Sequence, residues 1–290
     1  MKVIVTGAAG LVGRAVVSAF AAENEAVAAF DHGTLDISDA VAVGSVLASE
    51  SPDVVINCAA WTDVDGCELD EDRAHRDNAL GPGVLALACR KVGALLITIS
   101  TDYVFDGEKD GFYTQRDQPN PQSVYAASKL EGERRAQESW ARTIVVRSGY
   151  IFGAGGTNFL STVVDRARRG DQLRVINDTF GTPTYAPHLA QRLHRLAELD
   201  LPGIFHIVNA GEGVSFYTFA RTALDIAGLD HEQLESVSLA ALDRPAARPR
   251  NSRLRCLLSE AIGLEPMRLW TDALHEFVTR TSPAIRSKAS

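Results

Sequence analysis

The stretch Thr6-Gly7-Ala8-Ala9-Gly10-Leu11-Val12-Gly13 follows the short apolar run 3–6 and leads directly into a helix-length segment, residues 11–22. Glycines at this spacing allow a tight turn, a close approach of the backbone to a pyrophosphate, and close packing of the helix on the strand. The first turn of the helix adds unpaired N–H groups and a partial positive charge. The stretch predicts a strand-to-helix turn that binds a dinucleotide, although glycine spacing alone also occurs in turns without a ligand.

The rest of the chain alternates between strand-length and helix-length segments. The strand-like runs are apolar, rich in β-branched residues and without strict polar alternation; they cover 3–6, 27–30, 54–57, 95–100, 143–147 and 204–208. Helix-length segments lie at 11–22, 40–49, 72–92 and 123–139. Strands that are buried on both faces by intervening helices form a parallel sheet. We therefore expect an α/β protein with a doubly wound, Rossmann-like parallel sheet.

The alternation loosens after about residue 150, at the loop Gly153-Ala154-Gly155-Gly156. We expect a dinucleotide-binding domain over residues 1–150 and a smaller, mainly substrate-binding domain over 151–290, with about 180–210 returning to the first domain. Ligands in such sheets bind beyond the carboxyl ends of the strands. The site should therefore lie between the two domains.

The composition is that of an ordinary globular chain. Among 290 residues, 46% are hydrophobic, and 29 Lys and Arg face 37 Asp and Glu for a net charge of −8. This apolar fraction excludes disorder for most of the chain, and the negative charge argues against nucleic-acid or anionic-membrane binding. No apolar stretch approaches the roughly 20 residues of a membrane span.

The cysteine and histidine residues lack the spacing of a metal site or of a disulfide framework. The four cysteines lack C-x-x-C spacing, and the seven histidines are scattered without an H-E-x-x-H motif. We expect reduced thiols, no metal site and a cytoplasmic protein.

Two acidic positions follow the second predicted strand. Asp31 stands 18 residues beyond Gly13, where a carboxylate accepts hydrogen bonds from an adenosine ribose and favours NAD. His32 follows directly and would instead help to admit the 2′-phosphate of NADP, so the cofactor stays open between NAD and NADP. The pair Asp36-Ile37 would border the adenine, or the segment would simply start a helix with Ser38 or Asp39 as its N-cap.

Three further residues predict the chemistry. Residues 95–100 deliver Thr101 to the carboxyl edge of the sheet, and Tyr125 and Lys129 are four apart on a predicted helix, so they share one face. A nearby ammonium lowers the pKa of a phenol, which makes Tyr125 a usable acid or base, while Thr101 would hydrogen-bond a reacting carbonyl oxygen. A Tyr-x-x-x-Lys pair alone is common on helices. Its place after a dinucleotide turn and a strand-end hydroxyl favours a carbonyl reductase.

Longer stretches strengthen this interpretation. The chain carries Leu35-Asp36-Ile37-Ser38-Asp39, Asn57-Cys58-Ala59-Ala60-Trp61-Thr62-Asp63-Val64-Asp65, Ser100-Thr101-Asp102-Tyr103-Val104-Phe105-Asp106-Gly107, Ser128-Lys129-Leu130-Glu131-Gly132-Glu133 and Gly181-Thr182-Pro183-Thr184. Together with the glycine turn and the Tyr-x-x-x-Lys pair, they resemble the dTDP-4-dehydrorhamnose reductase family of the extended short-chain dehydrogenases/reductases. The resemblance runs from residue 1 to about 254.

The resemblance implies NAD(P)H-dependent reduction of the 4-keto group of a dTDP-6-deoxy-hexulose to dTDP-L-rhamnose, with a nucleotide-sugar as the binding partner. The catalytic residues that it implies are Thr101, Tyr125 and Lys129. The cofactor residues are Gly7, Gly10, Leu11, Val12, Asp31, Asp36, Ile37, Ala59, Ala60 and Thr62, with Tyr125 and Lys129 beside the nicotinamide. The sugar side is Thr62, Val64, Thr101, Tyr103 and the segment Arg147-Ser148-Gly149-Tyr150.

Departures from the family pattern leave alternatives. Tyr150 stands where many members carry Trp, and it offers less area for stacking on a sugar. A 4-ketoreductase for another dTDP-deoxysugar is therefore an alternative, as is a non-catalytic regulatory subunit that retains the fold. Dehydration is disfavoured, because the similar 4,6-dehydratases have Asp-Glu after the Thr and this chain has Asp102-Tyr103. A homodimer is possible.

Two charged segments have open interpretations. The run 244–255 holds five arginines, which would clamp a diphosphate or simply line a solvated loop. Glu131 and Glu133 are expected on the surface of the helix that carries Lys129.

Overall fold

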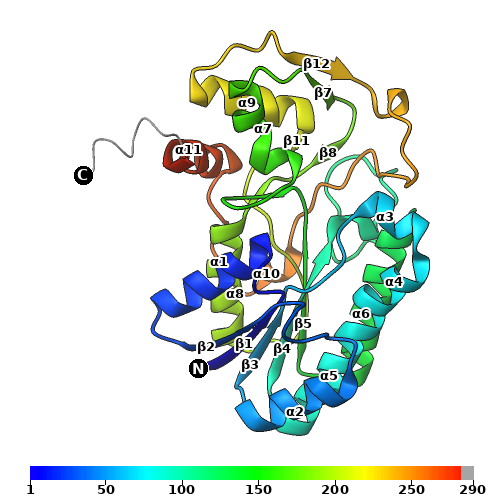
Figure 1. Cartoon of the computed structure of the whole chain (residues 1–290), viewed down its shortest axis with the longest axis vertical. Helices are drawn as coiled ribbons and strands as arrows, with labels where there is room; N and C mark the ends of the chain where they lie inside the picture. The colour runs from blue at the N-terminus through cyan, green and yellow to red at the C-terminus, as the bar shows by residue number, and fades with distance from the viewer. Residues whose placement is uncertain (282–290) are drawn as a thin grey trace.

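The computed structural model describes residues 1–281, and residues 282–290 of the expected second domain lie outside the described part. Its centre is a six-stranded parallel sheet in the order β10-β5-β4-β3-β1-β2 (Figure 1). The strands are β1 (Lys2–Thr6), β2 (Ala26–Phe30), β3 (Val54–Asn57), β4 (Leu95–Thr101), β5 (Thr143–Ser148) and β10 (Gly203–His206). The run predicted over 204–208 thus ends earlier, at His206. A doubly wound, Rossmann-like α/β fold is confirmed.

Helices cover both faces of this sheet (Figure 1). On one face lie α1 (Leu11–Ala22) and α8 (Ala186–Leu199), and on the other α2 (Ala40–Glu50), α5 (Gly81–Val92) and α6 (Val124–Ser139). Val5, Ile56 and Ile97 are fully buried against the first pair, and Ile4, Val55 and Leu96 face the second set. Burial on both faces is the reason that the strands lack polar alternation.

The helix predicted over 72–92 is divided. α3 (Val64–Leu69) and α4 (Glu71–His75) are followed by a wide π-helical turn, Arg76–Leu80, before α5 begins. Pro82 lacks the N–H that would bond to the carbonyl of Asn78 in a regular helix. Gly132 of α6 packs directly against that carbonyl, where a Cβ would overlap it. The turn also points the Asn78 side chain inward, where it bonds to the backbone of Trp61.

Most of the later elements form a smaller unit beyond the carboxyl ends of the sheet (Figure 1). Its helices are α7 (Phe159–Arg168), α9 (Phe216–Ala227) and α11 (Trp270–Thr281), which share an apolar core around Phe152 and Phe219. Short strand pairs connect it: β6 (Ile151–Phe152) with β9 (Thr184–Tyr185), β7 (Leu173–Ile176) with β12 (Leu234–Val237), and β8 (Phe180–Gly181) with β11 (Val214–Ser215). The short helix α10 (Leu257–Ala261) and the 3₁₀ turns Asp102–Val104 and Leu239–Ala241 complete the described elements.

Two further features concern helix length and the cysteines. Within residues 1–281, no helix combines the length and the apolar character that crossing a membrane requires. The four cysteines are free thiols, and burial raises the pKa of Cys58 and of Cys89 to about 12.

Candidate active site

The turn between β1 and α1 has the geometry that its glycines predict. Gly7 has a φ of +66°, and a Cβ there would lie 2.5 Å from the backbone nitrogen of Ala59. A Cβ at Gly13 would overlap the carbonyl oxygen of Gly7. Gly10 starts α1 without a side-chain cap, so N–H groups of the first turn remain available to a ligand. The turn lies where the strand order reverses, between β1 and β3, and it fits a dinucleotide pyrophosphate.

A cavity beside this turn brings together the residues predicted for the adenosine. Its lining includes Gly7, Gly10, Asp31, His32, Asp36, Ile37, Ala59 and Ala60. Asp31 is held by its own turn, because its Oδ1 accepts from the N–H groups of Gly33 at 3.0 Å and Thr34 at 3.1 Å. Asp39 caps α2, which confirms the N-cap interpretation of this segment. Asp36 borders the cavity, and its contact with the adenine stays a prediction.

The sequence interpretation did not include six residues of this cavity: Ala9, Leu35, Cys58, Trp61, Arg73 and Asp77. The guanidinium of Arg73 on α4 lies 4.2 Å from the centre of the Trp61 ring. Such stacking is a cation–π contact, and the same guanidinium pairs with Asp77, which also lines the cavity, at 3.5 Å. Twelve residues and a helix boundary separate Trp61 and Arg73 in the sequence, so no local pattern indicates the pairing.

A second cavity continues from the glycine turn toward the smaller unit. The predicted residues that line it are Leu11, Val12, Thr62, Val64, Thr101, Tyr103, Tyr125, Lys129 and Tyr150. Gly10, Cys58 and Ala60 line both cavities. The predicted cofactor and sugar residues therefore form one continuous site.

Thr101 and Tyr125 meet inside this second cavity. Thr101 is the last residue of β4, and Tyr125 lies in the first turn of α6, whose N-cap Ser123 accepts from the N–H of Ala126. Both side chains are buried, and both line this cavity. Burial raises the pKa of Tyr125 far above its ordinary value. The expected lowering by Lys129 is thus wrong for the chain by itself, because desolvation of the phenolate outweighs any nearby charge.

Lys129 points from α6 to the end of β4, where its Nζ donates to the carbonyl of Ile99 at 2.7 Å. Burial lowers the pKa of this ammonium to about 8, and the negative charge of Glu133 opposes that shift. One further turn along α6, Glu133 is only 3% exposed, which corrects its predicted place on the surface. Its carboxylate pairs with Arg147 of β5 at 2.6 Å and accepts a hydrogen bond from Ser100.

The sugar end of the cavity is aromatic. Tyr150 has a φ of +46° and stacks on Phe216, with ring centres 4.3 Å apart. Phe216 and Phe159 start α9 and α7, and both line the cavity, although the sequence interpretation did not include them. Of the predicted segment 147–150, Ser148 to Tyr150 line the cavity, whereas Arg147 turns to Glu133.

Comparison with known proteins agrees with this geometry. The family model described as the RmlD substrate binding domain matches residues 1–282. This chain belongs to that family.

Relatives across the family cover nearly the whole chain. The dTDP-4-dehydrorhamnose reductase of Streptomyces griseus is 39% identical over 99% of this chain and 94% of its own length. The crystal structure of a dTDP-4-dehydrorhamnose reductase from Clostridium acetobutylicum has a TM-score of 0.92 at 37% identity, covering 97% of this chain and 99% of that one. The Bacillus anthracis dTDP-4-dehydrorhamnose reductase, in complex with NADP, has a TM-score of 0.93 at 32% identity, covering 97% and 100%. Like them, this RmlD-family protein is an NAD(P)-dependent oxidoreductase.

The arginine-rich segment 244–255 of this family member is in part a solvated loop, because Arg244, Arg250 and Arg255 are exposed, and in part packed against the rest of the chain. Arg248 pairs with Asp65 of α3 at 2.8 Å, and Arg244 pairs with the same carboxylate at 3.1 Å. Asn251 donates to the carbonyls of Lys109 and Gly111, and Ser252 donates to the buried carboxyl of Asp102. Through these bonds the segment connects to loops that follow the strands of the sheet. None of its residues lines either of the two cavities described above.

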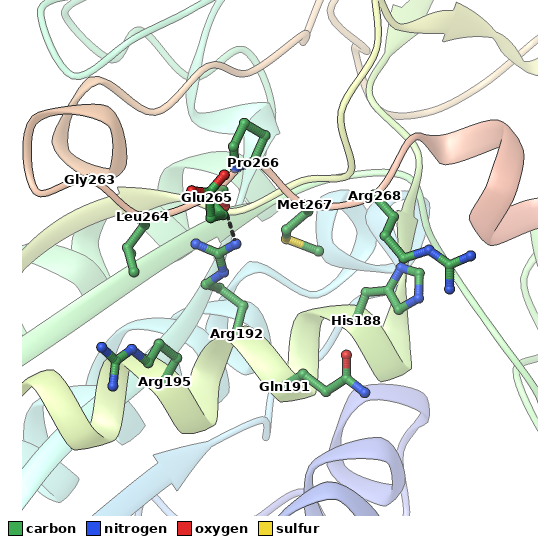
Figure 2. Close-up of a pocket in the computed structure, with 10 residues that line it drawn as sticks. All are labelled: His188, Gln191, Arg192, Arg195, Gly263, Leu264, Glu265, Pro266, Met267 and Arg268. Atoms are coloured by element: carbon green, nitrogen blue, oxygen red, sulfur yellow. Dashed lines mark hydrogen bonds between the residues drawn. The ribbon is translucent and has the colours of Figure 1, made fainter.

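Another hollow lies away from this site, between α8 and residues 263–268 (Figure 2). It contains three arginines, Arg192, Arg195 and Arg268, but their guanidinium groups point in different directions. Arg192 donates to the backbone carbonyl of Glu265. None of the predicted functional residues lines this hollow, and its charges do not converge on a ligand.

Proposed function

We propose that this protein uses NAD(P)H to reduce the 4-keto group of a dTDP-6-deoxy-hexulose, giving dTDP-L-rhamnose. The observation that carries the proposal is the pair of buried hydroxyls, Thr101 and Tyr125, that line a cavity continuous with the glycine turn. The names of the relatives support the choice of sugar nucleotide.

Each group then has one role. The bound cofactor supplies the hydride. Tyr125, whose buried phenol keeps its proton at neutral pH, gives that proton to the oxygen of the former keto group. Thr101 donates a hydrogen bond to the same oxygen and orients it, and Lys129 supplies positive charge beside the site as the phenolate develops.

The first cavity would hold the adenosine half of the cofactor, and the second would hold its nicotinamide half together with the substrate. The pyrophosphate would bind at the glycine turn, to Gly7, Gly10, Leu11 and Val12. The adenosine and ribose would bind to the remaining cofactor residues: Asp31, His32, Asp36, Ile37, Ala59, Ala60 and Thr62. Thr62, Val64, Tyr103 and Tyr150 contact the sugar nucleotide, with the Tyr150 ring available to one sugar face.

The direct test is NAD(P)H oxidation by the purified protein with dTDP-4-keto-6-deoxy-L-mannose made in the same tube by a dehydratase and an epimerase. Rapid oxidation with dTDP-L-rhamnose as product is expected. No oxidation, with the cofactor shown to bind, would overturn the proposal.

A reductase for another dTDP-deoxysugar is the second candidate. It is favoured by Tyr150 in place of Trp and by a 35% identical relative from Streptomyces antibioticus, named a probable dTDP-4,6-dihydroxy-2-methyloxan-3-one 4-ketoreductase. Comparing keto-sugars in the same assay separates the two candidates. A regulatory subunit would bind cofactor and reduce none of them. A homodimer and a cytoplasmic location stay predictions.

A further inference from the structure

Asp102 is a buried carboxyl that the proposed mechanism leaves without a role. It follows Thr101 directly and is only 3% exposed. Its Oδ1 faces the Thr101 hydroxyl at 3.2 Å, and its Oδ2 accepts a hydrogen bond from Ser252. Gly149 leaves room for this carboxyl, because a Cβ there would overlap Oδ2. The carboxyl is therefore fixed in place from two sides.

The hydroxyl of Thr101 has a single hydrogen, so it can donate only one hydrogen bond at a time. Its oxygen accepts from the backbone N–H of Tyr103 at 3.2 Å, which leaves one further lone pair and one O–H. The carboxyl of Asp102 takes one of them at 3.2 Å, and the other is left for the keto oxygen of a substrate in the cavity that Thr101 lines. The direction of each hydrogen bond therefore depends on whether Asp102 carries a proton.

The two protonation states give opposite arrangements. An ionised Asp102 accepts the only hydrogen of Thr101, which then has no hydrogen for the keto oxygen. A neutral Asp102 donates its own hydrogen to Thr101, so the Thr101 hydrogen is free to point into the cavity. The second arrangement is the one that the reduction needs, because the oxygen that gains charge must receive hydrogen bonds.

We propose that Asp102 is a positioning residue that sets the direction of the Thr101 hydrogen bond, with Ser252 holding its carboxyl, and that the neutral carboxyl is the active form. The proposal rests on the reductase function argued above. The protein would thus contain a proton-dependent switch one residue away from its reacting groups.

The surroundings of Asp102 favour the neutral form. The titratable groups that face it are phenols: Tyr103 of its own turn, Tyr125 of α6 and Tyr150 after β5. Arg248, in the segment that carries Ser252, pairs with Asp65, and the ammonium of Lys129 bonds to Ile99. Burial without a paired cation raises the pKa of Asp102 to about 7, and the hydrogen bonds from Ser252 and Thr101 oppose this shift.

The test compares pH profiles of kcat for wild type, Asp102→Asn and Ser252→Ala. Wild-type kcat should fall as the pH rises through about 7. Asparagine donates to Thr101 and accepts from Ser252 as the neutral acid does, so Asp102→Asn should keep low-pH activity within a few-fold and lose the decline near pH 7. Only the later decline should remain, as Lys129 loses its charge at about pH 8. Ser252→Ala removes a donor to the ionised form and should move the decline upward by roughly one pH unit.

Ser259→Ala is the matched control, because its hydroxyl bonds to Cys256 in α10 and it should leave the profile unchanged. A merely structural role for Asp102 predicts lower kcat at every pH with the decline at its wild-type position, and that result would overturn the proposal.

A second readout keeps the test independent of the substrate. The carboxyl signal of Asp102 in ¹³C NMR, assigned by its loss in Asp102→Asn, should titrate near neutral pH in wild type and higher in Ser252→Ala. Titration in the ordinary acidic range of Asp refutes the switch whether or not the enzyme turns over. Neutral titration without any keto-sugar reduction would instead refute the proposed function and leave the switch in place.

Discussion

At the scale of single residues, Tyr125 is the group on which the proposed chemistry depends most. Tyr125→Phe removes the acid but keeps the ring, which packs edge-on to Tyr103 with centres 6.3 Å apart. Loss of general acid catalysis should lower kcat by about 10²–10⁴-fold. Stopped-flow turnover measures this loss, and fluorescence titration should show NADPH affinity changed by no more than a few-fold.

The matched control is Tyr217→Phe on α9, away from the cavity lining, which should turn over like wild type. Wild-type turnover by Tyr125→Phe itself would contradict the assigned role.

Glu133 and Glu131 lie two residues apart on α6, and each forms an ion pair. Comparing the two pairs shows how burial changes the contribution of an ion pair to the free energy of unfolding. Glu133→Gln leaves Arg147 buried without its anion, and losing one partner of a buried pair costs about 3–5 kcal/mol. Glu131 pairs with Arg135 at the surface, so Glu131→Gln should cost at most about 1 kcal/mol. Urea unfolding followed by circular dichroism measures both. Equal losses in the two variants would rule out the argument.

At the scale of elements, the contact between β1 and α1 depends on Gly13. A methyl group there would overlap the Gly7 carbonyl, so Gly13→Ala should force the helix away from the turn, weaken NADPH binding by at least tenfold and lower the Tm. Gly44→Ala in α2 is the control. No atom lies within 4 Å of a Cβ at Gly44, and the substitution should stabilise the helix by up to about 1 kcal/mol.

Calorimetry and cofactor titration together check this pair of variants. If Gly13→Ala bound NADPH normally, the close approach of helix and strand would have no role in forming the cofactor turn.

In the helical region 71–92, the local sequence predicts the helix but not its shape. Its helical character is readable from the sequence, but the wide turn at Arg76–Leu80 depends on both Pro82 and the packing of Gly132 from α6. Local preference therefore predicts the element, whereas a contact from another helix decides its shape.

At the scale of the whole molecule, Asp65 anchors the 244–255 segment to α3. Hydrogen bonds from Arg248 hold the pKa of this carboxyl below its ordinary value of 3.8. A lowered pKa in the folded state adds stability that is complete above the ordinary value and is lost as the pH falls through the folded one. Asp65→Asn should therefore lower the Tm at neutral pH, and the difference from wild type should shrink at pH values below about 3.8.

Differential scanning calorimetry at several pH values checks this expectation. Asp165→Asn, which removes an exposed pair with Arg168 on α7, should change the Tm little at any pH. A pH-independent difference between Asp65→Asn and wild type would show that the ion pairs are not the anchor.

The parallel sheet was predictable from the alternation of apolar strand-length and helix-length segments, and the glycine turn and the shared helix face of Tyr125 and Lys129 from spacing within a few residues. The burial of Glu133 became visible only in the folded chain, since its partner Arg147 comes from β5. The folded chain likewise shows that Ser252 reaches Asp102 across 150 residues and that Phe216 meets Tyr150. Such contacts join side chains from different helices, strands and loops, and no local pattern carries that information.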